Sequence, residues 1–342
     1  MVGKKDSQEL VDVLEDIKKE GKTLYIVGHV PPDYDSLGGG FGLAHIAKSM
    51  GLEAKVCSEF KHDAGYLQNN ILYNELDLAK KVSPHSVIGK DDPIAFVDVY
   101  PHDTNCPELE CTPRIIINHH PIDDVEAAKY AGTFMDARQA GSSIALVMDH
   151  MNNLGVELTS AEKDLATLML YGLRVDTKNY LTATELDFTA SPLLQEHADR
   201  EMIAKITNKR YPREVLKMIK GMDEKEVGNY RFAVVKVSTG DLVRPFADAL
   251  AEYSGCPMAL AVAKIEEAGE KDWLVLGRSN NSAHNVADCI HKVFDTGRGH
   301  WYAAGATLTT KEIYTKFGID ESKDLSVLKQ VLGALEEKLK KL

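Results

Sequence analysis

The chain has 342 residues, 44% hydrophobic and 27% charged, which is enough for two soluble domains that each bury a core. Its formal net charge is −12, from 52 acidic and 40 basic residues. Because phosphate contacts dominate the affinity for long nucleic acids, this acidic balance excludes a protein that tracks a polymer along a basic groove. A small anionic substrate is favoured instead, and the short basic run at residues 205–210 is expected to be a solvated surface.

The five cysteines are scattered and odd in number, which is typical of a reducing compartment, so a cytoplasmic protein is expected. Cys106 and Cys111 are close enough to form half of a zinc site, but no second pair follows them. No apolar run approaches the ~18–20 residues of a membrane span. The amphipathic N-terminal stretch also lacks the apolar core of a signal peptide, so no membrane association is expected.

In chain order, the first half alternates helical and strand patterns. The first predicted elements are a helix at 10–19, a strand at 23–27 and a helix from 38 to about 50. The triplet Gly38-Gly39-Gly40 opens that second helix in this reading, and its bare backbone could approach a phosphate. Further strands are predicted at 54–57, 94–97, 114–117 and 132–135, and helices at 142–153 and 161–171. This alternation predicts an α/β fold with a doubly wound, mostly parallel sheet.

The second half predicts a smaller α/β domain after a polar helical connector. Its predicted strands are 230–237, 258–265 and 273–276, with helices at 244–253 and 285–294. A Lys/Glu/Leu-rich amphipathic helix at 326–342 is expected on the surface or at a dimer contact. The predicted boundaries are therefore 1–195 for the first domain, 196–226 for the connector, 227–322 for the second domain and 323–342 for the final helix.

Chemistry-bearing side chains follow several apolar segments of the first half. His29, Asp33 and Asp35 come directly after the first predicted strand. Open parallel sheets place their sites outside the carboxyl ends of the strands, so these three side chains can share one crevice. They are hard or borderline metal ligands.

Three further segments end in the same kinds of side chain. Asp98 follows the strand at 94–97, His119 follows the strand at 114–117, and Asp176 follows the apolar stretch at 165–173. A lone Asp in such a place is usually a helix cap, and a double His is usually structural, but coincidence over four segments is harder to explain this way. Six Asp and His ligands suit two divalent cations, most readily manganese, cobalt or iron. His120 could then contact a phosphate or protonate a leaving oxygen.

These residues form four motifs that resemble those of the DHH phosphoesterase superfamily. The motifs are His29-x3-Asp33-x-Asp35, Asp98, Asn118-His119-His120 and Gly172-x3-Asp176. The second half also resembles the DHHA1 signature of that superfamily, in Arg278-Ser279 and in the stretch from Gly297 to Gly305. The motifs span nearly the whole chain in the family's order.

The resemblance implies a role for each matching residue. His29, Asp33 and Asp98 would hold one cation, and Asp35, Asp98, His119 and Asp176 would hold the other, with Mn²⁺ expected in both cases. His120 would bind the scissile phosphate, with Asn118 orienting its neighbours. The implied substrate-binding residues of the second domain, across a cleft from the first, are Arg278, Ser279, Gly297, Arg298, Gly299 and His300. A surface ion pair at Arg278 and a simple tight turn at the glycines are the plainer readings.

Two positions depart from the family pattern. Asn118 stands where the family has its first Asp, so it can accept hydrogen bonds but adds no negative charge. Arg298 stands where the family usually has glycine. Its guanidinium could add a phosphate contact, or it could point outwards.

Within the superfamily the chain resembles the nanoRNase and 3′-phosphoadenosine-5′-phosphate phosphatase group. The resemblance implies a manganese-dependent hydrolase that uses a metal-activated hydroxide on short oligonucleotides, dinucleotides or 3′-phosphoadenosine-5′-phosphate. The alternatives are a cyclic-dinucleotide phosphodiesterase, an exopolyphosphatase-like enzyme and a nucleotide sensor without turnover. A short nucleotide partner and a homodimer are expected, and long duplex nucleic acid is not.

Overall fold

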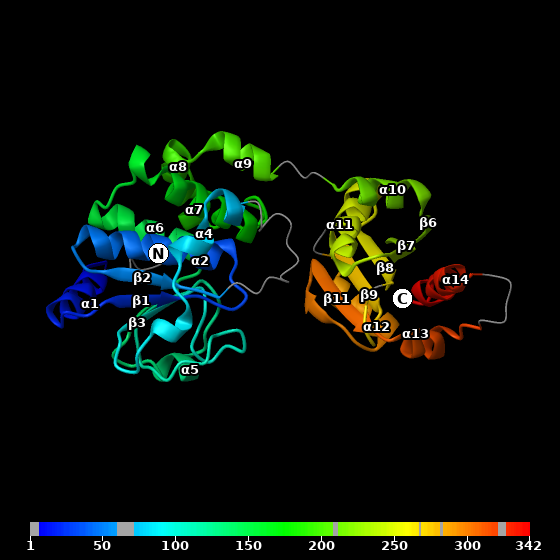
Figure 1. Cartoon of the computed structure of the whole chain (residues 1–342), viewed down its shortest axis with the longest axis horizontal. Coiled ribbons are helices and arrows are strands. Elements are labelled where there is room, and N and C mark those ends of the chain that lie inside the picture. The colour runs from blue at the N-terminus through cyan, green and yellow to red at the C-terminus, as the bar shows by residue number, and fades with distance from the viewer. Residues whose placement is uncertain (1–6, 60–71, 208–210, 267, 281–282, 321–325) are drawn as a thin grey trace. The chain divides into compact units, whose positions relative to one another are not determined.

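The computed structural model describes residues 7–59, 72–207, 211–266, 268–280, 283–320 and 326–342. The chain divides into two compact units, Met1–Asn208 and Lys209–Leu342 (Figure 1). This division falls inside the connector predicted at 196–226. The helix α9 (Arg200–Thr207) packs on the first unit, and α10 (Arg213–Gly221) packs on the second.

The first unit is built on a parallel five-stranded sheet of order β2-β1-β3-β4-β5. The strands are β1 (Leu24–Val27), β2 (Ala54–Cys57), β3 (Ile94–Val97), β4 (Pro113–Ile117) and β5 (Phe134–Asp136). They are short apolar runs, and β3 is buried along its whole length, as expected for a parallel sheet covered on both faces. The predicted α/β fold class is confirmed, and each predicted strand lies within two residues of an observed one.

Helices cover one face of this sheet more completely than the other. On one face, α2 (Tyr34–Ser49), α6 (Ser143–Leu154) and α7 (Lys163–Asp176) bury the larger apolar cluster, joined by α1 (Ser7–Lys19) and α8 (Glu185–His197). The opposite face carries the short α5 (Asp124–Ala128) (Figure 1). Side chains from the segment after β3 also pack on this face. A single-turn helix, α4 (Leu78–Lys81), follows β2.

The triplet Gly38-Gly39-Gly40 serves packing and does not form the predicted phosphate-binding entry. Helix α2 already begins at Tyr34, so the triplet lies inside it and is buried. A Cβ on Gly38 would lie 2.8 Å from Ile144 Cδ1, and one on Gly39 would lie 2.8 Å from Val97 Cγ1. The glycines therefore let α2 approach β3 and α6 closely.

The second unit is a six-stranded mixed sheet of order β10-β11-β9-β8-β7-β6. Its strands are β6 (Asp223–Val227), β7 (Tyr230–Val237), β8 (Met258–Ile265), β9 (Trp273–Ser279), β10 (Arg298–His300) and β11 (Ala303–Leu308). Only β7 and β8 run parallel. The stretch from Gly297 to Gly305, which resembles the DHHA1 signature, lies largely in a hairpin, β10–β11, at the edge of the sheet.

Helices cover both faces of this second sheet. Helix α11 (Val243–Ser254) packs on one face, and the other face is covered by α12 (Val286–Phe294), α13 (Thr310–Phe317) and α14 (Val327–Leu339). Helix α14 buries Val331, Leu332, Leu335 and Leu339 in this core, which places it within the unit. Among the described residues, no helix combines the length and apolar character that crossing a bilayer requires.

Candidate metal centre

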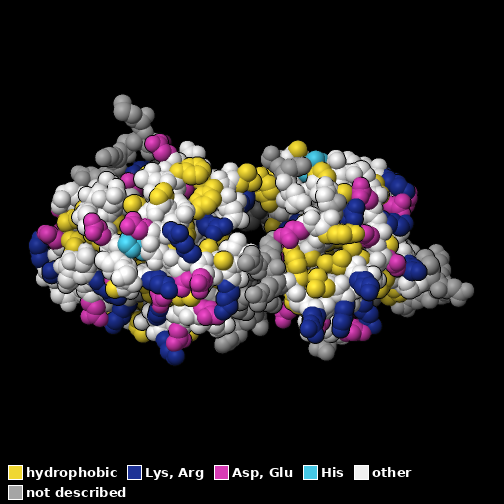
Figure 2. Space-filling view, turned by 90° about the horizontal axis from the view of Figure 1, so that it is seen from above, with side chains coloured by type: hydrophobic (Ala, Val, Ile, Leu, Met, Phe, Trp, Pro, Cys, Tyr) yellow, Lys and Arg dark blue, Asp and Glu magenta, His cyan; other side chains and the backbone are white. Residues whose placement is uncertain are grey.

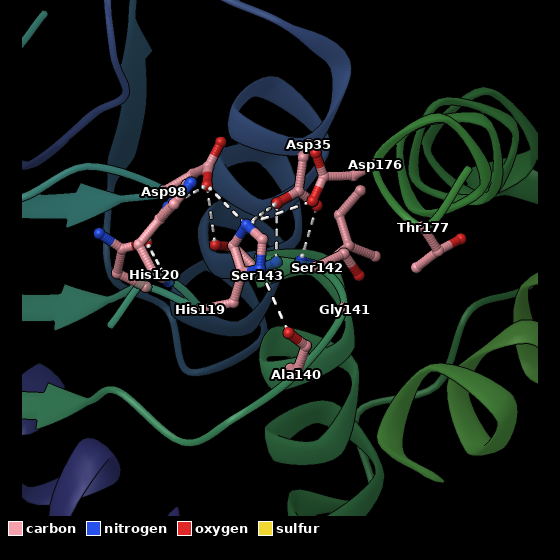
Figure 3. A network of polar contacts seen from close by, with 12 residues as sticks. Asp35, Asp98, His119, His120, Ala140, Gly141, Ser142, Ser143, Asp176 and Thr177 are labelled. Carbon is pink, nitrogen blue, oxygen red and sulfur yellow. Dashed lines mark hydrogen bonds and ion pairs between the residues drawn. The ribbon is translucent and has the colours of Figure 1, made fainter. Parts of the chain in front are cut away.

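The six predicted ligands lie together at the carboxyl end of the parallel sheet. Figure 3 labels Asp35, Asp98, His119 and Asp176 among them. Asp98 follows β3 directly, and His29 and His119 lie two residues beyond β1 and β4. Asp33 caps the N-terminus of α2 and Asp35 lies in its first turn, while Asp176 is the last residue of α7. Strand ends and helix ends thus bring distant residues to one place.

His29, Asp33 and Asp98 form a first group. The Nε2 atom of His29 lies 3.3 Å from Asp33 Oδ2 and 3.4 Å from Asp98 Oδ2. The Nδ1 atom lies 2.6 Å from the Pro31 carbonyl oxygen, which can only accept a hydrogen bond. Nδ1 therefore carries a proton, which leaves Nε2 as the ring atom that faces the two carboxylates.

His119, Asp35 and Asp176 form a second group that again adjoins Asp98. The Nδ1 atom of His119 donates to the Ala140 carbonyl at 3.3 Å, which leaves Nε2 as the ligand atom. Nε2 lies 3.2 Å from Asp176 Oδ2 and 3.4 Å from Asp98 Oδ1, with Asp35 Oδ2 at 3.9 Å. Nε2 is buried without a hydrogen-bond partner in the part of the chain that the structure describes.

Asp98 lies between the two groups and turns one oxygen to each. It is 4% exposed, and Ser143 Oγ donates to its Oδ1 at 3.2 Å. Its φ of 63° is in the left-handed region, which is unfavourable for a residue with a Cβ. Such strain persists where the surroundings hold the residue in place, and functional sites are its commonest location.

The electrostatics of the groups favour a bound cation. Burial alone would lower the pKa of His29, but hydrogen bonds and charges of Asp33 and Asp98 raise it to about 11. Burial likewise opposes protonation of His119, but Asp98, Asp35 and Asp176 raise its pKa to about 10. Both imidazoles therefore hold a positive charge at neutral pH unless another cation takes its place.

Burial and the neighbouring charges also shift the pKa values of the carboxylates. Burial and the nearby charge of Asp98 raise the pKa of Asp35 well above its usual value, and burial is also the main cause that raises the pKa of Asp176 to about 7. Burial would raise the pKa of Asp98 too, but His119 and His29 lower it to about 2. Buried carboxylates with imidazole Nε2 atoms directed at them fit divalent cations such as Mn²⁺.

Helix α6 holds Asp35 in place, a contact that sequence reasoning missed. The amides of Ser143 and Ile144 donate to Asp35 Oδ2 and Oδ1 at 2.7 and 3.1 Å. The positive end of the helix dipole thus faces the carboxylates. The pair Ser142-Ser143 before an apolar helical run was the available signal, because Ser142 caps α6.

Asp187 is a second residue that the sequence did not reveal. It is fully buried and accepts hydrogen bonds from the Gly141 amide at 2.7 Å and from Ser142 Oγ at 2.8 Å. These bonds join the start of α8 to the loop that carries Ala140, the partner of His119. Asp187 therefore orients a ligand indirectly.

His120 and Asn118 lie beside the two groups. Asn118 Oδ1 accepts from the backbone amide of His120 at 3.1 Å and from its Nδ1 at 2.8 Å. The same Nδ1 lies 3.5 Å from Asp98 Oδ1, and the His120 side chain is 56% exposed. The predicted phosphate-binding imidazole is thus fixed at one nitrogen and open to solvent.

The predicted substrate-binding residues of the second unit lie at the end of β9 and at or within the edge strand β10. Arg278 and Ser279 are the last residues of β9, and Arg298 is exposed on β10. Arg278 Nε donates to Asp248 of α11 at 2.6 Å, so an ion pair already holds its guanidinium. The remaining predicted residues, Gly297, Gly299 and His300, lie immediately before or within β10.

The glycine at position 299 is required by the hairpin itself. Its φ is 145°, and a Cβ there would lie 2.4 Å from the Cα of Ala304 on β11. Gly299 pairs with Ala304 in the register of the two strands. The bare backbone therefore serves the close approach of the strands.

Comparison with known families agrees with this arrangement of strand-end ligands. Residues 23–173 match the DHH family, N-terminal domain. That match contains His29, Asp33, Asp35, Asp98 and His119, and it ends just before Asp176. All of the matched residues lie in the first unit.

The chain is also similar to proteins along most of its length. It is 25% identical over 329 residues to the membrane protein–large ribosomal subunit bL9 fusion protein of Aster yellows witches'-broom phytoplasma (strain AYWB). The match covers 91% of the chain but only 37% of that relative. A similar protein of Onion yellows phytoplasma (strain OY-M) is 26% identical over the same length, with the same coverage of both chains.

Solved structures share the fold at low identity. An exopolyphosphatase-related protein from Bacteroides fragilis superimposes with a TM-score of 0.63 at 16% identity, covering 97% of this chain and 98% of that one. CDC45 from Entamoeba histolytica gives a TM-score of 0.51 at 10% identity, over 96% of this chain and 98% of that one. At these identities the likeness is one of fold.

Proposed function

We propose that this protein is a metal-dependent phosphoesterase that hydrolyses short nucleotides. The observation that carries the proposal is the pair of Asp/His groups that share Asp98, with both imidazole Nε2 atoms directed at carboxylates. One group would hold a cation with His29, Asp33 and Asp98. The other would hold a cation with Asp35, Asp98, His119 and Asp176. Divalent cations bound there would polarise phosphoryl oxygens and lower the pKa of a bound water.

The chain's own residues contribute orientation and proton handling. Ser143 and the first amides of α6 hold Asp98 and Asp35, so the carboxylates keep their places as charge changes in the reaction. Asn118 fixes the Nδ1 proton of His120, which leaves Nε2 free to contact a phosphate or the leaving oxygen. Burial lowers the pKa of His120, which favours the neutral form in the free protein.

A small nucleotide is the favoured substrate class. The net charge of −12 disfavours binding along a long polyanion such as a nucleic acid. Basic and acidic side chains are also interspersed on the face shown in Figure 2. The exposed Arg298 of β10 offers a guanidinium to a terminal phosphate. We infer that dinucleotides and 3′-phosphoadenosine-5′-phosphate are hydrolysed to a mononucleotide or orthophosphate.

Inorganic polyphosphate is a second candidate substrate. The fold neighbour from Bacteroides fragilis is an exopolyphosphatase-related protein. Divalent cations held by the two Asp/His groups would act on the phosphoryl group of any such substrate. Cyclic dinucleotides are a further alternative, and binding without turnover is the non-enzymatic one. These differ in what lies beyond the scissile phosphate, so a substrate panel separates them.

The test is release of mononucleotide and orthophosphate with Mn²⁺ and then with EDTA. The substrates are a 5′-phosphorylated dinucleotide, 3′-phosphoadenosine-5′-phosphate, a cyclic dinucleotide and polyphosphate. Asp98→Asn should bind Mn²⁺ weakly and lose at least about a hundred-fold in kcat/KM, because both groups lose a carboxylate. Asp12→Asn on the exposed face of α1 is the matched control and should be unchanged. Turnover that survives EDTA or Asp98→Asn contradicts the proposal.

A further inference from the structure

Trp301 lies exposed at the tip of the β10–β11 hairpin, between the strand ends at His300 and Ala303. Its side chain is 45% exposed. Within the described residues, its indole makes no ring stacking, cation–π contact or side-chain hydrogen bond. A large aromatic surface is thus left in contact with water.

Other large aromatic side chains of this unit are accounted for by packing. Trp273 is 1% exposed, and its Nε1 atom donates to Thr310 Oγ1 at 3.1 Å. Tyr253 is more exposed than Trp301, but the Arg231 guanidinium lies over its ring at 5.6 Å from the centroid. Among the residues that the structure describes, no such contact accounts for the open face of Trp301.

The backbone around Trp301 is held firmly. The Trp301 carbonyl accepts from the amide of Val286, the first residue of α12, at 2.9 Å. The neighbouring Tyr302 carbonyl accepts from the Ser279 amide at 2.9 Å. An aromatic side chain on a fixed backbone loses little conformational entropy when a ligand stacks on it.

The same hairpin also carries an exposed cationic side chain. Arg298 is exposed on β10, three residues before Trp301, so the hairpin carries both an exposed guanidinium and an exposed indole. Proteins that bind single-stranded nucleic acids use this combination, in which a base stacks on an aromatic ring and a cation contacts the phosphate. Inorganic phosphates have no group that could use the indole.

We propose that Trp301 stacks on a nucleobase of the substrate and so selects nucleotides over phosphate compounds that lack a base. This inference rests on the proposed function, because it names a residue that would bind the base of the proposed nucleotide substrate. Trp301 would act in binding and selection, with no part in the chemical step.

Intrinsic fluorescence tests the stacking without turnover. The chain has two tryptophans, and the buried Trp273 emits at shorter wavelength than the exposed Trp301. With EDTA present, 3′-phosphoadenosine-5′-phosphate or a 5′-phosphorylated dinucleotide should quench the long-wavelength emission in a saturable way. The same dinucleotide with both bases replaced by hydrogen should not quench it, and Trp301→Ala should abolish the response.

Kinetics with Mn²⁺ give the second readout. Trp301→Ala should raise KM for the dinucleotide about ten-fold or more with little change in kcat, and Trp301→Phe should restore most of the affinity. KM for the abasic dinucleotide should stay the same in all three proteins. Tyr253→Ala removes an exposed aromatic side chain of the same unit and should leave KM unchanged.

The outcomes separate this inference from the proposed function. Hydrolysis of nucleotides with an unchanged KM in Trp301→Ala, and no quenching, overturns the stacking and leaves the phosphoesterase in place. Quenching without hydrolysis of any substrate overturns the proposed phosphoesterase activity and supports nucleotide binding at Trp301. Equal quenching by intact and abasic dinucleotides also contradicts the inference, since the base would then play no part.

Discussion

Asn118 shows how a single buried amide sets the state of a neighbouring imidazole. Its Oδ1 accepts two hydrogen bonds from His120, while its Nδ2 is buried without a partner among the described residues. A carboxylate here would hold His120 equally well and would favour its charged form. The amide therefore keeps the orientation of His120 and leaves its pKa lower than an aspartate would.

Substitutions at Asn118 should separate orientation from charge. Asn118→Ala removes the acceptor, and kcat should fall about 10–100-fold, as is usual for residues that orient a catalytic group. Asn118→Asp should retain most activity and raise the pKa of His120, which NMR titration of its ring measures. Asn153→Ala, an exposed change on α6, is the control. An unchanged kcat in Asn118→Ala would show that His120 needs no such support.

At the scale of elements, a buried ionic network joins β5, α6 and α1 of the first unit. Asp136 is fully buried and accepts two hydrogen bonds from Arg138 Nε and Nη2, at 2.9 and 2.7 Å. His150 Nε2 lies 3.0 Å from the same carboxylate, and its Nδ1 lies 2.9 Å from Ser7 Oγ. The Asn118 amide donates to the Asp136 carbonyl, so the network supports the backbone of the site.

This network predicts a loss of stability in acid. Burial alone would raise the pKa of Asp136, but His150 and Arg138 lower it to about 2, below the usual value of 3.8. A pKa that is lower in the folded state stabilises the fold above about pH 4, and that stabilisation is lost as the pH falls towards 2. It amounts to about 2 kcal/mol, which urea unfolding between pH 5 and pH 2 should show.

Asp136→Asn is the matching variant for this acid dependence. It should be less stable at pH 7 by about 3 kcal/mol, because Arg138 loses its buried partner charge. Its free energy of unfolding should also vary less between pH 5 and pH 2 than that of the natural protein. An equally steep acid dependence in the variant would assign the effect to other carboxylates.

At the scale of the whole molecule, all six candidate metal ligands belong to the first unit. Each unit has its own apolar core, with α2, α6 and α7 over the first sheet and α11, α12 and α14 over the second. Metal binding at these ligands would therefore stabilise one core directly. Substrate selection by Trp301 would belong to the other unit.

Calorimetry of the full chain should show this division. With EDTA we expect two unfolding transitions, and Mn²⁺ should raise the midpoint of one of them. At a free metal concentration 100 times the dissociation constant, the stabilisation is about 2.7 kcal/mol. Asp98→Asn should remove the Mn²⁺ effect and retain both transitions. A single transition that Mn²⁺ shifts as a whole would contradict independent units.

The local sequence pattern was sufficient to predict much of the first unit's fold and candidate site. The apolar runs of β1, β3 and β4 and the polar residues that follow them predicted both the parallel sheet and the place where the candidate ligands meet. This works because strand burial and strand direction follow from short-range composition, and parallel strands end at the same edge. The same reasoning misplaced the start of α2, since glycines inside a buried helix look like a turn.

Only the tertiary structure decided how those residues are held. The α6 amides on Asp35, the Ala140 carbonyl on His119 and the left-handed backbone of Asp98 each depend on segments distant in sequence. The β10–β11 hairpin that exposes Trp301 was also beyond the local pattern, because two very short strands carry too few residues to show alternation. Sequence thus determined which groups meet at the site, and through-space packing determined their tautomers, partners and exposure.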